Sequence, residues 1–220
     1  YIIKYSASGS YISHMSVNGT ANVMAQDVAR DAAGNYFVVG DFSGTVDFDP
    51  SAAVFNANSG TSNGKAFIAK YDQNFNFLSV NTFTATNYSA FQSIKIDAAG
   101  KIYLGGYFWG TQDFDFGAGV ANETSTTTGS NMFVMYDSNM NLLNRFVNFG
   151  RFKTLCEVDN SGNIYLAGSF DAVSDFDPSA ATYTLNTAGG FDVYVAKYNS
   201  SMALQWVGQM GNSATETLKQ

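Results

Sequence analysis

The sequence predicts an all-β protein, part of a β-propeller with four-stranded antiparallel blades. The first observation is a phrase that occurs three times, at residues 31–50, 97–116 and 159–178. The second is a shorter phrase that alternates with it, at residues 1–5, 67–72, 132–137 and 194–199. The third is that both phrases recur every 62 to 66 residues. A fixed period of this kind is the sequence signature of a repeat architecture.

The period is longer than the roughly 40 to 50 residues of common propeller repeats. The additional residues have a place in the polar stretch between the two phrases, for example residues 51–64, which is rich in Ser, Asn and Gly. We therefore expect an enlarged loop between the second and third strands of each unit.

Each unit is predicted to contain four strands, because short runs of β-branched and aromatic residues lie between turn residues. In the middle copy these runs are residues 91–96, 102–108, 132–136 and 142–149. The long loop is expected to carry a further ribbon through residues 113–116. Ahead of the first complete unit, residues 1–5 and 11–17 are predicted to form a hairpin around a Gly/Ser turn, and residues 24–30 the next strand.

An Asp-x-x-Gly turn is predicted between the first and second strands of each unit. The aspartate accepts a hydrogen bond from a backbone N–H two residues on, and the glycine adopts a positive φ without penalty. These structural turn residues are Asp31, Gly34, Asp97, Gly100, Asp159 and Gly162.

The second strand of each unit does not alternate between apolar and polar residues. Residues 36–39, 102–104 and 164–167 are all apolar, and a strand that is apolar on both faces is buried on both faces. We therefore expect sheets stacked face to face, as in the radial arrangement of a propeller. An open β-solenoid is the alternative, since its repeats are also buried in series.

The chain is expected to be one propeller region that is part of a longer parent chain. The predicted divisions are a half blade at 1–23, blades at 24–89, 90–152 and 153–211, and the first strand of a further blade at 212–220. A closed propeller typically has 4 to 8 blades, which is more than these units supply. Targeting signals would then lie outside this sequence.

Composition disfavours two classes of partner. The net charge is −7, and the 11 Lys and Arg residues are scattered, whereas nucleic acids and anionic membrane surfaces require a basic patch. No apolar run approaches the roughly 18 to 20 residues of a membrane span, so no membrane insertion is expected. The single Cys156 excludes an intrachain disulfide.

Paired carboxylates are the feature of the repeat that most suggests metal binding or catalysis. They are Asp47 and Asp49, Asp113 and Asp115, and Asp175 and Asp177. On a strand, residues two apart point to one face and the residue between them to the other. Such pairs could contribute to a Ca²⁺ site, which needs 6 to 8 oxygen ligands, and calcium is the one cofactor that the sequence suggests.

The alternative for these pairs is structural. The aspartates would cap turns, while Phe48, Phe114 and Phe176 anchor the ribbon. A glycosidase site also needs two carboxyl groups, but a catalytic pair is normally singular, whereas this pair occurs once in each unit.

The other candidate functional residues are those that are not repeated from unit to unit. The chain has a single His14 and a single Cys156 and contains no G-x-S-x-G sequence, so no catalytic constellation is recognised. Trp109 follows the strand at 102–108, where the other copies have Ser43 and Asp171. An exposed tryptophan can stack on a sugar ring or mark a protein interface, and the alternative is packing on a neighbouring blade.

The repeat resembles the bacterial SBBP-type β-propeller repeat. The first element is the pattern D-x-x-G-N-x-Y-x-x-G, carried by Asp31, Gly34, Asn35 and Gly40, and again by Asp159, Gly162, Asn163, Tyr165 and Gly168. The second is F-[IV]-x-K-Y, carried by Phe67, Lys70 and Tyr71, and the third is L-x-W, carried by Leu204 and Trp206. Departures include Lys101 in place of the asparagine and Met135 in place of the lysine.

The resemblance implies a propeller scaffold in an extracellular or cell-surface bacterial protein, and it implies no common catalytic residue. We therefore expect a non-enzymatic module for binding, adhesion or structural scaffolding, with a protein or glycan partner that the sequence does not identify. One alternative is a carbohydrate-binding or carbohydrate-processing domain that uses Trp109 and nearby carboxylates. Another is a filament or surface-assembly subunit whose repeats associate edge to edge.

Overall fold

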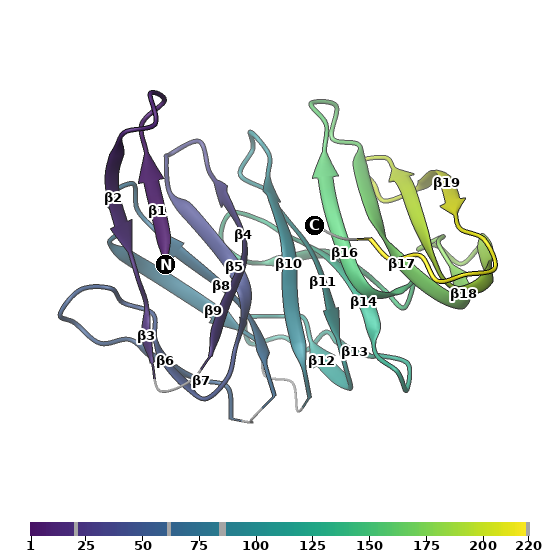
Figure 1. The fold of residues 1–220 in the computed structure, drawn as a ribbon, viewed down its shortest axis with the longest axis horizontal. Coiled ribbons are helices and arrows are strands. Elements are labelled where there is room, and N and C mark those ends of the chain that lie inside the picture. Colours follow the sequence, from purple (N-terminus) through teal and green to yellow (C-terminus); the bar gives the residue numbers. More distant parts are fainter. Residues whose placement is uncertain (20–21, 61–62, 84–86, 219–220) are drawn as a thin grey trace.

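The computed structural model describes residues 1–19, 22–60, 63–83 and 87–218. These residues form antiparallel β-sheets joined by turns and loops (Figure 1), which confirms the all-β prediction. No helix that could span a membrane occurs in the described part of the chain.

Three four-stranded sheets make up most of the molecule, and each is a meander of consecutive major strands. Sheet A contains β4 (Val23–Arg30), β5 (Tyr36–Phe42), β8 (Lys65–Tyr71) and β9 (Phe77–Thr82). Sheet B contains β10 (Ser89–Ile96), β11 (Ile102–Phe108), β14 (Ser130–Tyr136) and β15 (Leu142–Val147). Sheet C contains β16 (Arg151–Val158), β17 (Ile164–Asp175), β18 (Thr184–Tyr198) and β19 (Leu204–Met210).

Smaller elements surround these sheets. A hairpin is formed by β1 (Ile2–Tyr5) and β2 (Tyr11–Met15), and β3 (Asn18–Gly19) pairs with the ribbon of β6 (Thr45–Asp47) and β7 (Asn56–Asn58). The ribbon of sheet B is β12 (Thr111–Asp113) and β13 (Asn122–Thr124), and in sheet C it is continuous with β17 and β18. The ribbon in the long loop is therefore present, but it ends at Asp113 and does not run through residues 113–116 as expected.

The sheets are stacked in chain order, from the N-terminal hairpin in purple to sheet C in green and yellow (Figure 1). Strand β10 contacts β4, β5 and β8 of sheet A, and β16 contacts β10, β11 and β14 of sheet B. The first strands of sheets B and C thus pack against the preceding sheet, and β10 contacts both β4 and β16.

Three apolar clusters lie between successive layers. The A/B cluster includes Phe37, Val39, Ala66 and Ile68 of sheet A with Leu104, Met132, Val134 and Tyr136 of sheet B. The B/C cluster includes Tyr103, Phe133 and Met135 of sheet B with Leu166, Tyr194, Ala196 and Tyr198 of sheet C. The third cluster joins the N-terminal hairpin to the opposite face of sheet A through Ile2, Met15, Val38, Phe67 and Tyr71.

The expected burial of the second strand on both faces is confirmed for β5 and β11, whose residues are almost all buried. It is wrong for β17, where buried Ile164 and Leu166 alternate with partly exposed Tyr165 and Ala167. The physical reason is that one face of sheet C packs on sheet B, while no further sheet covers the other face in the described residues.

The C-terminal segment was expected to form a strand over 212–220, and its last two residues lie outside the described part of the chain. Residues 212–218 form no strand but lie along the middle of β18, where the Gly190 N–H donates to Ala214 O at 3.1 Å. The Glu216 N–H donates to Phe191 O at 2.7 Å, and the Leu218 N–H donates to Ser169 Oγ at 3.0 Å. This segment therefore covers one end of sheet C.

Candidate ligand-binding site

The Asp-x-x-Gly turns use their carboxylates to hold the local backbone. Asp31 accepts hydrogen bonds from the backbone N–H and the side-chain amide of Asn35, both at 2.8 Å. Asp159 makes the same two contacts with Asn163, at 2.9 and 2.8 Å. In the middle copy Asp97 keeps the backbone contact, with Lys101 N–H, but lacks the amide contact because lysine replaces the asparagine. Asp97 also accepts from the Ala99 N–H and the Tyr103 hydroxyl, as Asp159 does from Ser161 and Tyr165. The turn glycines Gly34, Gly100 and Gly162 have φ values of 90°, 80° and 77°.

Sequence reasoning missed a second set of such turns, between the third and fourth strands. Asp72 and Asp137 accept from the backbone and side chain of Asn76 and Asn141. These asparagine amides hold the pKa of both carboxyls below the usual value. The positive-φ position is occupied here by Phe75, Met140 and Met202 rather than by glycine. The pattern D-x-N-x-N was the available signal.

The paired aspartates also bond to their own loops. The first carboxylate of each pair accepts two backbone N–H groups, as Asp113 does from Asp115 at 3.0 Å and from Ala121 at 2.8 Å. The second accepts one, as Asp115 does from Gly117 at 2.6 Å. The same bonds recur for Asp47 and Asp49 and for Asp175 and Asp177.

In all three units the ribbon strand ends at the first aspartate of the pair. The expectation that both carboxylates lie on one strand face is therefore wrong there, because the second carboxylate closes the following turn. Across the described residues, no three His, Cys, Asp or Glu side chains converge as a metal site. Calcium binding by these loops stays a prediction.

The phenylalanine between each pair of aspartates anchors its loop. Phe48, Phe114 and Phe176 are buried, and their carbonyls accept hydrogen bonds from Tyr71, Tyr136 and Tyr198 at 2.9, 2.8 and 2.8 Å. Burial raises the pKa of each of these tyrosines, so each hydroxyl remains a donor. Three equivalent loops are thus fixed by one repeated contact.

We expect Asp113→Ala to lower the free energy of unfolding by about 1 to 3 kcal/mol, because two N–H groups lose their acceptor. Urea unfolding with EDTA and with added Ca²⁺ should show the same loss under both conditions. Asp115→Ala is the matched variant and should have the smaller effect, since its carboxylate accepts one of these bonds. A Ca²⁺-dependent gain in the wild type that disappears in Asp113→Ala would instead show metal binding.

The singular residues His14 and Cys156 are not brought together. His14 Nδ1 lies 2.7 Å from the Tyr11 hydroxyl on the N-terminal hairpin. Cys156 is buried between sheets B and C with its Sγ 3.3 Å from Ser93 Oγ, and burial raises the pKa of its thiol to about 12. A thiol with this pKa is a poor nucleophile near neutral pH.

An aromatic row crosses sheets B and C at the end where their first strands begin. It consists of Tyr88, Tyr107, Phe152 and Phe191, with successive ring centroids 6.2, 6.1 and 4.9 Å apart. The backbone of Trp109 lies next to that of Tyr88, because the Trp109 backbone N–H donates to Tyr88 O at 2.8 Å. Its side chain is 49% exposed. The predicted Trp109 therefore adjoins the row through its backbone, and none of the four residues of the row was predicted as a site residue from the sequence.

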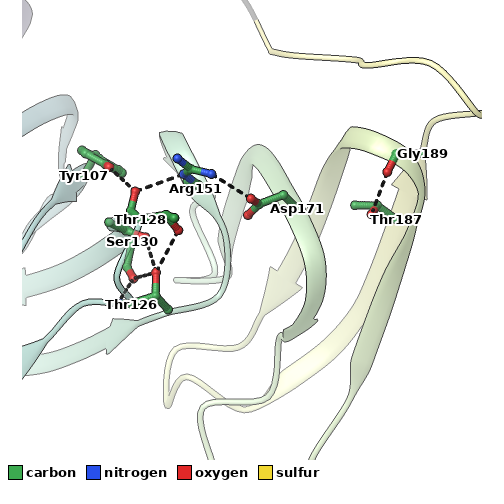
Figure 2. A network of polar contacts seen from close by, with 9 residues as sticks. Tyr107, Thr126, Thr128, Ser130, Arg151, Asp171, Thr187 and Gly189 are labelled. Carbon is green, nitrogen blue, oxygen red and sulfur yellow. Dashed lines mark hydrogen bonds and ion pairs between the residues drawn. The ribbon is translucent and has the colours of Figure 1, made fainter.

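Arg151 is held near Tyr107 of this row by contacts to Thr128 and Asp171 (Figure 2). Its guanidinium lies over the Phe152 and Phe191 rings at 4.7 and 5.6 Å, and its Nη1 is 2.9 Å from Asp171 Oδ2. Its Nε donates to Thr128 O, which also accepts from the Tyr107 hydroxyl. The site thus presents aromatic surface together with a held cation and a carboxylate.

Phe152 has a φ of 77°, in the left-handed region that a phenylalanine rarely adopts. Gln92 of sheet B holds this backbone from both sides, since its amide donates to Phe152 O at 2.8 Å and accepts from Thr154 N at 3.1 Å. The side chain remains 45% exposed. A strained residue that presents an exposed ring is typical of a functional surface.

Among the described residues the row is found at one place, because the other repeats have different residues at the equivalent positions. Strand register aligns Tyr107 with Asp41 and Ser169, and Phe191 with Gly64 and Gly129. The signal that could have found the site is this departure at equivalent positions. By contrast, the repeated carboxylates are engaged by their own turns in every copy.

Asp41 is buried beside the first ring of the row. Gln26 and Tyr88 hydrogen-bond to its carboxyl, but burial dominates and raises the pKa of that carboxyl. The carboxyl also raises the pKa of Tyr88, after burial, to about 12. In the described residues its Oδ1 has no hydrogen-bond partner.

The raised pKa means that folded Asp41 binds its proton more tightly than the unfolded chain does. Its contribution to stability is therefore complete below the unfolded pKa of about 3.9 and is lost as the pH rises through the folded pKa. We expect Asp41→Asn to raise the urea midpoint at pH 7 and to lose this advantage near pH 3. An equal effect at both pH values would contradict this assignment.

A scan against models of known protein families finds no match to this chain, and a search of curated proteins finds no similar sequence.

Proposed function

We propose that this chain is a non-enzymatic binding module built on part of a β-propeller, in a secreted or cell-surface bacterial protein. Two observations support the propeller assignment. The four-stranded meanders are stacked in chain order, and their first strands are in contact, β10 with β4 and β16 with β10. The resemblance to SBBP-type repeats supports the location and the absence of a common catalytic residue.

The observation that carries the binding role is the aromatic row with Arg151. The repeated aspartates accept hydrogen bonds from the backbone of their own turns. The residues of the row, by contrast, are not repeated, and they join sheets B and C at one end of their first strands. Aromatic and arginine side chains are enriched among residues that dominate binding energy. A rigid scaffold that presents such a surface is suited to a protein or glycan partner.

A glycan is the second candidate, and exposed Trp109 beside Tyr88 favours it. An aromatic ring can pack on the apolar face of a sugar, while Arg151 and Asp171 offer hydrogen bonds to hydroxyl groups. A protein partner would use the same surface. The kind of ligand that binds therefore distinguishes a protein partner from a glycan.

The test compares Phe152→Ala and Trp109→Ala with Trp206→Ala on a glycan array. Trp206 is a matched control because it is 47% exposed, close to the 49% of Trp109, and lies on β19 outside the row. Glycan binding that is lost in the first two variants and kept in Trp206→Ala would support the glycan. No glycan binding would exclude it.

The protein partner is tested by a pull-down from a bacterial surface extract. A bound protein that is retained by wild type and by Trp206→Ala, but not by Phe152→Ala, would support binding at the row. Equal retention by all three proteins would show that the row is not the binding surface. Circular dichroism and thermal unfolding of each variant check that it is folded.

A further inference from the structure

A hollow of about 330 Å³ lies between sheets A and B and shares no residue with the aromatic row. We call it the A/B hollow. Its walls come from β5, β8 and β9 of sheet A and from the turn that follows β14 of sheet B. Both sheets are four-stranded meanders of the described residues, so packed layers of this chain bound the hollow. Its volume is within the range of small-molecule sites, roughly 300 to 1,000 Å³.

Asn81 opens this hollow, because other units have a large apolar residue at its position. Strand register places Met15 of the N-terminal hairpin and Phe146 of sheet B where sheet A has Asn81. Both are buried members of the apolar clusters in the other two layers, with 6% and 8% of their surface exposed. Asn81 is polar and partly exposed. The layer between sheets A and B therefore keeps a space that a large apolar side chain fills elsewhere.

Three side chains of sheet A bring hydrogen-bond donors to the A/B hollow. Lys70 and Ser79 are cross-strand partners, and Asn81 follows two residues later on the same face. The Lys70 ammonium lies 4.9 Å from the centre of the Phe37 ring and 4.0 Å from Asp31 Oδ2. Its side chain is 28% exposed, so the charge lies at the wall of the hollow and within reach of a ligand.

The lysine at the same position of the hairpin makes a further contact. The Lys4 ammonium donates across its junction to Gln73 O at 3.3 Å. Among the described residues Lys70 has the ion pair with Asp31 and no such hydrogen bond. The Lys70 ammonium therefore retains donors for an added acceptor.

The remaining walls of the A/B hollow are mostly apolar. Phe37 and Ile68 belong to the A/B cluster, and Met140 packs against it. Ser138 and Asn139 complete the lining from the turn of sheet B. Among the described residues no carboxylate lines the hollow. A ligand that suits this lining has a negative charge at one end and an apolar body at the other.

We propose that the A/B hollow binds a small organic carboxylate. The carboxylate pairs with the Lys70 ammonium and accepts hydrogen bonds from the Ser79 hydroxyl and the Asn81 amide, while the apolar body packs on Phe37 and Met140. The net charge of −7 repels anions at long range, so binding depends on these local contacts. This site goes beyond the function proposed for the aromatic row and is independent of it.

An NMR titration of the wild-type chain with hexanoate tests the proposal, with hexanamide and inorganic phosphate as comparison probes. Hexanoate should shift the side-chain amide signal of Asn81 and the backbone signals of residues 138–140 in a saturable way at millimolar concentration. Hexanamide has the same shape without the charge and should bind about tenfold more weakly. Phosphate has the charge without an apolar body and should also bind more weakly than hexanoate.

Lys70→Met is the informative variant, because Met135 occupies the same position in sheet B and the repeat therefore accepts methionine there. It should abolish the shifts that hexanoate causes. Lys197→Met is the matched control, since Lys197 has this position in sheet C and lies outside the hollow, over the Tyr165 ring at 5.3 Å. That variant should bind hexanoate like the wild type.

Asn81→Met tests the hollow itself. Methionine should fill the space as Met15 does in the hairpin, so this variant should raise the urea midpoint and no longer bind hexanoate. If Lys70→Met fails to fold by circular dichroism, Lys70→Gln replaces it. A wild type without saturable shifts, hexanoate binding kept in Lys70→Met or in Asn81→Met, or equal binding of hexanoate and either comparison probe would each overturn the proposal.

Discussion

Gly106→Ala is expected to destabilise the protein by about 3 kcal/mol or more, because the added methyl group overlaps backbone that cannot rotate away. A Cβ at Gly106 would overlap the carbonyl oxygen of Ala90 in the neighbouring strand β10. Here β10 carries a bulge between Phe91 and Ser93 that brings its backbone toward β11. The first strand and the second strand would have to separate.

The same close approach of the first strand to a glycine of the second strand occurs in each of the three four-stranded sheets. A Cβ at Gly40 would overlap Met24 O, and one at Gly168 would overlap Lys153 O, each beside a bulge of the first strand. The glycine that ends the repeated D-x-x-G-N-x-Y-x-x-G pattern is therefore required by packing. We expect Gly40→Ala and Gly168→Ala to share the large effect.

Urea unfolding followed by far-UV circular dichroism measures this loss. Gly208→Ala is the matched control, since a Cβ there would have its nearest neighbour at 4.0 Å and Gly208 also lies within a strand. That variant should be neutral or slightly stabilising, because alanine restricts the unfolded chain. Equal losses at Gly106 and Gly208 would show that the bulge contact is not the cause.

The repeated elements could be predicted from the sequence because their determinants are local. Short apolar runs between turn residues predict β5 and β11 within a few residues, and an aspartate followed by a glycine three residues later predicts the turn at Asp31. The third-to-fourth-strand turns were missed because Phe75 and Met140 occupy positions where glycine is the usual signal.

The candidate site could not be predicted beyond Trp109 because it depends on contacts between sheets. Tyr107 and Phe152 meet only when β16 stacks on sheet B, and Gln92 fixes the unusual backbone of Phe152 from a strand 60 residues away. The repeated carboxylates were predicted as site residues because repetition can be recognised in the sequence. A cluster that occurs once forms only when distant residues meet in the folded chain.

Phe133→Ala is expected to cost about 3 to 5 kcal/mol, the usual loss for a buried phenylalanine. Phe133 is fully buried in the B/C layer with Phe146 and Tyr194, and truncation leaves a cavity between two sheets that are each held by their own hydrogen bonds. The loss should appear in urea unfolding as a lower midpoint with little change in slope.

Val195→Ala is the informative partner variant, because Val195 occupies the position of Phe133 one repeat later. It lies on the face of sheet C that no further sheet covers in the described residues, so its loss should be about 1 kcal/mol or less. Equal costs at the two positions would mean that this face of sheet C is already as well packed as the equivalent face of sheet B.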